Sequence, residues 1–169
     1  MAYWQLFYHA VWATKGRQPL ITDDAESLVY SLMRDKAVDL GGTVFAINGI
    51  ADHVHMAVSI PPRIAVADFI GQVKGATSFR LNQRRSATVA KFAWQTEYGV
   101  FSFDGKRLPN VVAYVERQKQ HHTQNNIIPI LERWDEGKVE TVQVREIEIP
   151  YLVADDQWWT EMMVLSGMD

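Results

Sequence analysis

The segment from Asp52 to Ile60 constrains the fold most, because apolar side chains alternate with other residues along its whole length. Successive side chains of a β-strand point to opposite faces of the sheet. The apolar side chains of this predicted strand therefore share one face, which we expect to pack into the core. They are Val54, Met56, Val58 and Ile60. The strand ends at Pro61-Pro62, since proline cannot donate a ladder hydrogen bond.

The opposite face of this strand carries His53 and His55. Two imidazoles two positions apart on a rigid strand can converge on one metal ion, and the small Ala57 and Ser59 leave space beside them. The alternative is a pair of histidines that only hydrogen-bond to their neighbours on a half-exposed face. The pattern favours a metal-binding or catalytic role. A histidine-triad nucleotide hydrolase would need a third histidine at position 57, where this chain has alanine.

Strand and helix signals alternate on both sides of this segment. Aromatic and β-branched residues predict the strands, whereas helical spacing of apolar residues, closed by Gly41-Gly42 or opened after Pro109, predicts the helices. The expected strands cover 3–14, 43–50, 52–60 and 92–103, and the expected helices cover 23–40, 65–85 and 110–124. The first six elements have the order of a ferredoxin-like fold, with an antiparallel sheet and helices on one face. We therefore predict an α+β fold, with an additional C-terminal helix that carries Tyr114.

The charge is distributed unevenly along the 169 residues, whose formal net charge is −3. Residues 1–128 contain 14 lysines and arginines against 10 acidic residues, whereas residues 129–169 contain 3 against 10. We therefore expect one domain over 1–128 and an acidic C-terminal extension of unknown role over 129–169. A basic domain is compatible with binding a phosphate backbone. The acidic extension is equally well explained as a solvated tail.

The chain contains no cysteine, which excludes disulfides, a thiolate nucleophile and a zinc–thiolate site. No N-terminal targeting pattern is visible, and no run approaches the roughly 20 apolar residues that a membrane span needs. We therefore expect a soluble protein of the cytoplasm.

The predicted helix after Pro109 places Tyr114 and Gln118 on one face, because they are four residues apart. Tyr114 offers a phenolic oxygen, and Gln118 offers a carbonyl oxygen suited to Mg²⁺ or Mn²⁺. A tyrosine titrates near pH 10, so as a nucleophile it needs a nearby cation or base, and a bound metal can provide this help. Taken alone, Tyr114 is better explained as a packing residue. The nearby Gln118, and a histidine pair in need of a third ligand, favour the functional interpretation.

The next two residues of interest are His121 and His122, at the end of the same helix. They can line a phosphate path, but they also suit a helix C-terminus through the helix dipole. We prefer the second interpretation.

Five motifs occur in order within residues 5–128. They are His-Ala-Val-Trp-Ala-Thr-Lys-Gly-Arg (9–17), Asp-His-Val-His-Met (52–56), Gln-Val-Lys-Gly-Ala-Thr-Ser (72–78), Trp-Gln-Thr-Glu-Tyr-Gly-Val-Phe-Ser (94–102) and Tyr-Val-Glu-Arg-Gln-Lys-Gln-His-His (114–122). This combination resembles the single-tyrosine transposases of the HUH class, which are the TnpA-like enzymes of minimal bacterial insertion sequences and their REP-associated relatives.

The resemblance implies a homodimer with active sites shared between subunits, acting on single-stranded DNA that often carries a hairpin. It implies that His53, His55 and Gln118 bind a divalent metal, Mg²⁺ or Mn²⁺, and that Tyr114 is the nucleophile. It also implies DNA contacts near the first and third motifs, although a solvated helix face explains each basic residue of the helix equally well. The candidate DNA-binding residues are Lys15, Arg17, Gln72, Lys74, Arg80, Arg84 and Arg85.

The implied reaction is attack of Tyr114 on a scissile phosphate, which leaves a 5′-phosphotyrosine and a free 3′-OH. A second 3′-OH then reverses the step and joins new ends, so that no cofactor besides the metal is needed. Two alternatives stay open. One is a nickase of the relaxase or replication-initiator type, and the other is a domesticated, non-mobile DNA-binding or repressor protein that keeps the fold.

Overall fold

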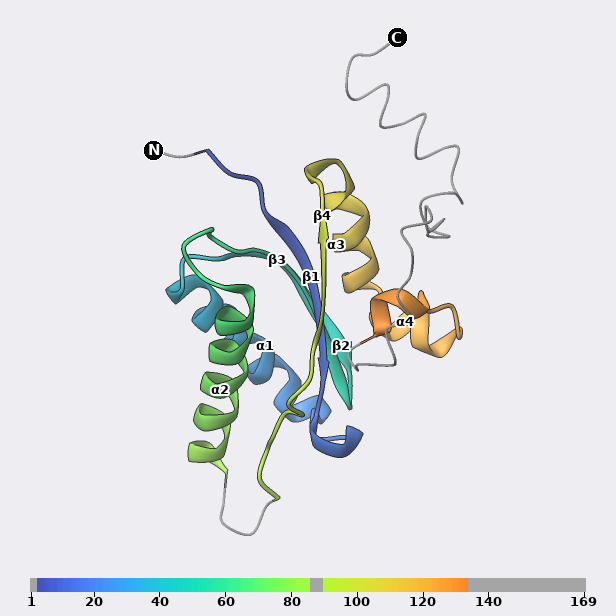
Figure 1. The fold of residues 1–169 in the computed structure, drawn as a ribbon. Helices are drawn as coiled ribbons and strands as arrows, with labels where there is room; N and C mark the ends of the chain where they lie inside the picture. Colours follow the sequence, from blue (N-terminus) through green and yellow to red (C-terminus); the bar gives the residue numbers. More distant parts are fainter. Residues whose placement is uncertain (1–2, 86–89, 134–169) are drawn as a thin grey trace. The chain divides into compact units, whose positions relative to one another are not determined.

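The computed structural model of the chain describes residues 3–85 and 90–133. These residues all belong to one compact unit, in which a four-stranded sheet carries helices on both faces (Figure 1). The strands are β1 (Phe7–Ala13), β2 (Thr43–Ile50), β3 (His53–Ser59) and β4 (Gly99–Phe103). The helices are α1 (Asp23–Asp39), α2 (Val66–Arg84), α3 (Leu108–Glu116) and α4 (Gln118–Thr123), with short 3-10 turns η1 (Lys15–Arg17), η2 (Gly105–Arg107) and η3 (Pro129–Glu132). Within the described residues, no helix is long and apolar enough to cross a membrane.

The strands lie in the order β2-β3-β1-β4, and each neighbouring pair is antiparallel. This is the strand order of a ferredoxin-like sheet, so the predicted α+β fold is confirmed. The two central strands, β1 and β3, pair so that Val11 stands opposite His55 and His9 stands opposite Ala57. The register therefore puts His9 on the same sheet face as the histidine pair.

The main core lies between the sheet and helices α1 and α2. Val54, Met56, Val58 and Ile60 are all buried in it, as the alternation along β3 predicts. The acidic first turn of α1 complements the helix dipole. Gly41, just after that helix, has φ of 84°, a backbone conformation that glycine adopts at no steric cost.

The second face of the sheet is covered by α3. Val111 and Val115 of this helix pack against Ala46 and Ala57, and the proline of its first turn starts it without loss of a hydrogen bond. Every residue of β3 is therefore buried, including those on the face that carries the histidines. Such a fully enclosed polar face needs hydrogen-bond or metal partners, since isolated buried polar groups are costly.

Three boundaries differ from the predicted ones. The first strand begins at Phe7 rather than residue 3, and the fourth covers only 99–103, with an isolated bridge between Thr14 and Trp94 before it. Around this bridge, Ala93 and Gln95 still bond to the backbone of Lys15 and Ala13, whereas side chains of α2 bind backbone groups on both sides of it. Lys74 donates to the carbonyls of Thr96 and Glu97, and Asn82 pairs with both backbone groups of Phe92.

The third difference is a break in the last predicted helix. Arg117 has φ of −95° and ψ of 14°, outside the helical region, and it separates α3 from α4. Tyr114 therefore lies in α3, whereas Gln118 begins α4. The expected acidic extension lies outside the described residues from position 134 onwards.

Candidate metal centre and tyrosine

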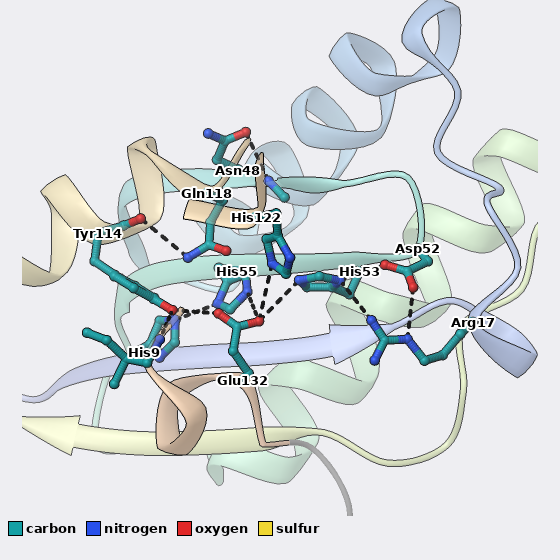
Figure 2. A network of polar contacts seen from close by, with 12 residues as sticks. His9, Arg17, Asn48, Asp52, His53, His55, Tyr114, Gln118, His122 and Glu132 are labelled. Atoms are coloured by element: carbon teal, nitrogen blue, oxygen red, sulfur yellow. Dashed lines mark hydrogen bonds and ion pairs between the residues drawn. The ribbon is translucent and has the colours of Figure 1, made fainter. Parts of the chain in front are cut away.

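Four side chains from three elements converge on the sheet face opposite α1 and α2. They are His53 and His55 of β3, His122 of α4 and Glu132 of η3, and one ligand atom of each lies within 4.8 Å of the others. The Glu132 Oε2 atom lies 3.3 Å from Nε2 of His53, 3.2 Å from that of His55 and 3.5 Å from that of His122 (Figure 2). Three imidazoles and a carboxylate are a common ligand set for divalent transition metals.

The protonation states of this cluster suit a cation. Burial lowers the pKa of His55 and of His122, so both rings are neutral at pH 7 and their nitrogens can act as ligands. Burial alone would raise the pKa of Glu132, but its close contacts with the imidazoles of His53 and His55 outweigh burial and hold that pKa well below its ordinary value. Neutral imidazoles and an ionised carboxylate are the forms that bind metal ions.

Gln118 lies beside this cluster and is fully buried. Its amide nitrogen donates to the Tyr114 carbonyl at 3.3 Å, whereas its amide oxygen has no hydrogen-bond partner among the described residues. In the view of Figure 2, the amide is drawn between Tyr114 and His122. An unpaired buried carbonyl oxygen is unfavourable by about 1–3 kcal/mol, so a cation next to it would satisfy it. The expected role of Gln118 as the third ligand stays a prediction.

Tyr114 lies on the other side of the same carboxylate. Its hydroxyl donates to Glu132 Oε1 at 2.5 Å and accepts from the backbone N–H of Ile128 at 3.2 Å. The ring stands edge-on to those of His9 and His55 and stacks on His121. Burial, together with the bond to Glu132, raises the pKa of Tyr114 above its ordinary value. The phenol is therefore protonated at neutral pH, and a nearby cation or base is needed to make it a nucleophile.

Two of the expected DNA-binding residues lie next to this centre. Arg17 donates to Asp52 at 2.8 Å, and Asp52 in turn contacts His53 Nδ1 at 2.7 Å. Lys15 is exposed on the same 3-10 turn. Both can therefore meet a phosphate that approaches the histidines.

The other expected DNA-binding residues lie on α2, which covers the opposite face of the sheet (Figure 1). Gln72, Arg80 and Arg84 are exposed there, and Arg85 donates to the carbonyls of Ala90 and Leu20. Lys74 is only 8% exposed, and its ammonium is committed to two backbone carbonyls. Burial lowers the pKa of Lys74 to about 8. The structure therefore does not bring these residues together with Tyr114.

Three residues of the site were not expected from the sequence. His122 is a member of the cluster rather than a residue that only serves the helix dipole. Glu132 carries no local signal, and His9 opens the first motif without any indication of a role at the site. Glu132 follows the predicted domain limit, and it reaches the histidines only because η3 packs against β1 and β4. The one sequence signal for this part of the site is the pair His121-His122. Adjacent residues of a helix point in different directions, so one ring can stack on Tyr114 while the other faces the donor cluster.

The position of η3 depends on Gly99, because a Cβ atom at this residue would overlap the Arg133 carbonyl oxygen. We expect Gly99→Ala to lower the free energy of unfolding by about 1–3 kcal/mol, as overpacked sites do. Urea unfolding measures it. Gly71→Ala on α2 is the matched control, since no atom lies within 4 Å of the added Cβ. That change should raise the free energy of unfolding by about 1 kcal/mol. Equal destabilisation by both would contradict the proposed contact.

Comparisons with known proteins agree with this architecture. The family model described as "Transposase IS200 like" matches residues 2–118. The ISDra2 transposase TnpA of Deinococcus radiodurans is 26% identical over 119 residues, which cover 68% of this chain and 85% of that protein. The transposase for insertion sequence element IS200 of Salmonella typhimurium is 28% identical over 119 residues, covering 68% and 78%.

Two solved structures share the fold. One is a Deinococcus radiodurans R1 protein described as a transposase, with a TM-score of 0.55 at 23% identity, covering 75% of this chain and 95% of that one. The other is a REP-associated tyrosine transposase bound to a REP hairpin, with a TM-score of 0.53 at 10% identity, covering 75% and 76%. Because the family match spans more than half of the sequence, the chain belongs to the IS200-like transposase family.

Proposed function

We propose that this transposase cleaves and rejoins single-stranded DNA through a covalent bond to Tyr114, with a divalent metal held beside it. The observation that carries the proposal is the shared carboxylate, because Glu132 touches the Tyr114 hydroxyl with one oxygen and three imidazoles with the other. A nucleophile and a set of metal donors thus meet at one buried point. The hairpin bound by a REP-associated relative supports a hairpin-bearing substrate for this chain.

The metal would be held by His53, His55 and Gln118, with His122 and Glu132 as further donors. This set is rich in nitrogen, which favours Mn²⁺ over Mg²⁺, since Mg²⁺ prefers oxygen ligands and water. When bound, a divalent ion supplies Lewis-acid stabilisation of the scissile phosphate and lowers the pKa of a nearby hydroxyl.

In the proposed step, the Tyr114 oxygen attacks phosphorus while the bond from phosphorus to the 3′ oxygen breaks. The phenol proton would pass to Glu132, which already accepts its hydrogen bond, and the leaving oxygen would take a proton from water to become a 3′-OH. The 5′ end is then held as a phosphotyrosine, and attack by another 3′-OH restores the tyrosine and joins new ends. Arg17 and Lys15 would orient the backbone phosphates next to the centre. The exposed basic residues of α2 would contact DNA farther along.

The subunit arrangement is part of the proposal. The resemblance implies a homodimer. Separately, a chromosomal DNA substrate implies that the protein acts in the cytoplasm. The contacts of Tyr114 with Glu132 and with the His55 ring occur within one chain. They favour a site that is complete in each subunit over one shared between subunits.

The wild-type protein is expected to form a covalent adduct when it is incubated with Mn²⁺ and single-stranded oligonucleotides from the DNA that flanks its gene, including any hairpin. The adduct is measured as a shifted band on a denaturing gel with end-labelled DNA. The same sequence as a duplex, and a reaction with EDTA, serve as controls and should give no band. DNA binding without any adduct would favour the repressor alternative, whereas an adduct that never yields joined strands would favour a nickase.

A further inference from the structure

His9 has no role in the mechanism above, although it is buried next to the centre. It lies on β1 and is 1% exposed. Its Nε2 atom lies 2.9 Å from Nδ1 of His55, and the two rings are nearly parallel, with an angle of 14° between their planes. His9 stands opposite Ala57 in the strand register, so a small side chain leaves room for its ring.

The direction of this hydrogen bond follows from the chemistry of imidazole. A neutral ring carries one proton, and the nitrogen without the proton is the one that can bind a metal ion. The Nε2 atom of His55 faces the cluster, 3.2 Å from Glu132 Oε2. With a metal on Nε2, the proton of His55 must sit on Nδ1, and it then points at His9 Nε2. His9 accepts it and carries its own proton on Nδ1.

The neighbouring ligand has an equivalent partner of another type. Nδ1 of His53 lies 2.7 Å from Asp52 Oδ1, and Arg17 holds that carboxylate from its other oxygen. Partners of this kind fix the ring orientation and the tautomer of metal-binding histidines. Both histidines therefore have Nδ1 engaged by a neighbouring side chain and Nε2 directed into the cluster.

We propose that His9 is a positioning residue, which holds His55 with Nε2 directed at the metal by accepting a hydrogen bond from Nδ1. The proposal rests on the metal site of the proposed function, but not on DNA cleavage. The ring of His9 is confined by Phe101, with centroids 6.2 Å apart, and by Tyr114 at 6.2 Å. It has therefore little freedom to turn away from His55.

Two variants separate the accepting nitrogen from the bulk of the ring. His9→Phe keeps an aromatic ring but removes the acceptor, whereas His9→Gln keeps an acceptor near the position of Nε2. We expect His9→Phe to weaken Mn²⁺ binding by about 10–100-fold and His9→Gln to stay within about threefold of wild type, in the range known for such outer partners. Isothermal titration of the full-length, metal-free proteins with Mn²⁺ measures both.

Phe101→Leu is the matched packing control, because it alters the other side of the His9 ring without touching a polar atom. Leucine still fills that side of the His9 ring, so the Mn²⁺ affinity of this variant should stay within about threefold of wild type. Wild-type affinity in His9→Phe would overturn the proposal. So would an equal loss in His9→Phe and His9→Gln, because the ring shape rather than the acceptor would then matter.

A measurement on the wild-type protein decides the matter even where a variant does not fold. In protein loaded with diamagnetic Zn²⁺, nitrogen NMR should show the His55 proton on Nδ1 and the metal on Nε2. Metal on Nδ1 of His55, or a wild-type protein that binds neither ion, would overturn the inference. Normal metal binding with the expected His9 effects, but without a DNA adduct, would reject the proposed function and leave the role of His9 standing.

Discussion

Tyr114→Phe is expected to abolish the covalent protein–DNA adduct while DNA binding persists. The change removes the oxygen that we propose to attack phosphorus, but it keeps the ring that packs against His9, His55 and His121. Loss of a catalytic nucleophile lowers rates by on the order of 10³-fold or more. The lost hydroxyl also leaves Glu132 and the N–H of Ile128 without this partner, and the free energy of unfolding should fall by about 1–3 kcal/mol.

The measurement is a single-turnover cleavage assay on a denaturing gel, with urea unfolding of the same preparation. Tyr30→Phe is the matched control, since its hydroxyl also donates to a glutamate, Glu26, at 2.9 Å. Glu26 lies on α1 and contacts α4 through the exposed Lys119. That variant should form the adduct at the wild-type rate. An adduct formed by Tyr114→Phe would show that another residue is the nucleophile.

Replacing His53 or His55 with alanine is expected to have the second large effect, on metal binding and cleavage together. Each change removes a fully buried nitrogen that faces Glu132. It also leaves an ionised carboxylate with one contact fewer. Because outer partners alone change metal affinity about 10–100-fold, loss of a ligand should weaken Mn²⁺ binding by at least about 100-fold. Isothermal titration gives the affinity, and the gel assay gives the cleavage.

His121→Ala is the control for this pair. Its ring stacks on Tyr114, with centroids 4.8 Å apart, but it is not a member of the donor cluster. Mn²⁺ affinity should therefore stay unchanged. Unchanged affinity in His53→Ala and His55→Ala as well would mean that the cluster does not bind the ion.

An equimolar mixture of His53→Ala and Tyr114→Phe tests whether one subunit or two subunits supply the residues of the active site. Each variant alone lacks one part, so a site complete within each chain predicts no adduct from the mixture. We expect this result because Tyr114 and the histidines already meet in one chain. Restored adduct in the mixture would mean instead that the tyrosine of one subunit serves the histidines of the other.

Much of the fold is predictable because the period of two along β3 assigns every residue to a face. It puts Met56 in the core and brings His53 and His55 to the same side, with ring centroids 5.1 Å apart. The proximity of Tyr114 and Gln118 also follows from local spacing, even though the helix breaks between them.

What could not be predicted depends on long-range pairing. His9 reaches His55 only through the register of β1 against β3, 46 residues apart in the chain. Glu132 arrives on a four-residue turn whose sequence resembles any short loop. Neither position has a periodicity that would separate it from an ordinary polar residue.

The single carboxylate of Glu132 has a thermodynamic consequence. Because one oxygen holds the phenol and the other faces the imidazoles, any event that shifts this side chain acts on both groups at once. Coupling of this kind is reciprocal. If the bound ion changes the affinity for DNA at the phenol, then DNA must change the affinity for the ion by the same factor. Metal binding and DNA binding would then be cooperative. Their coupling energy would depend largely on Glu132, which lies outside the family-matched residues 2–118.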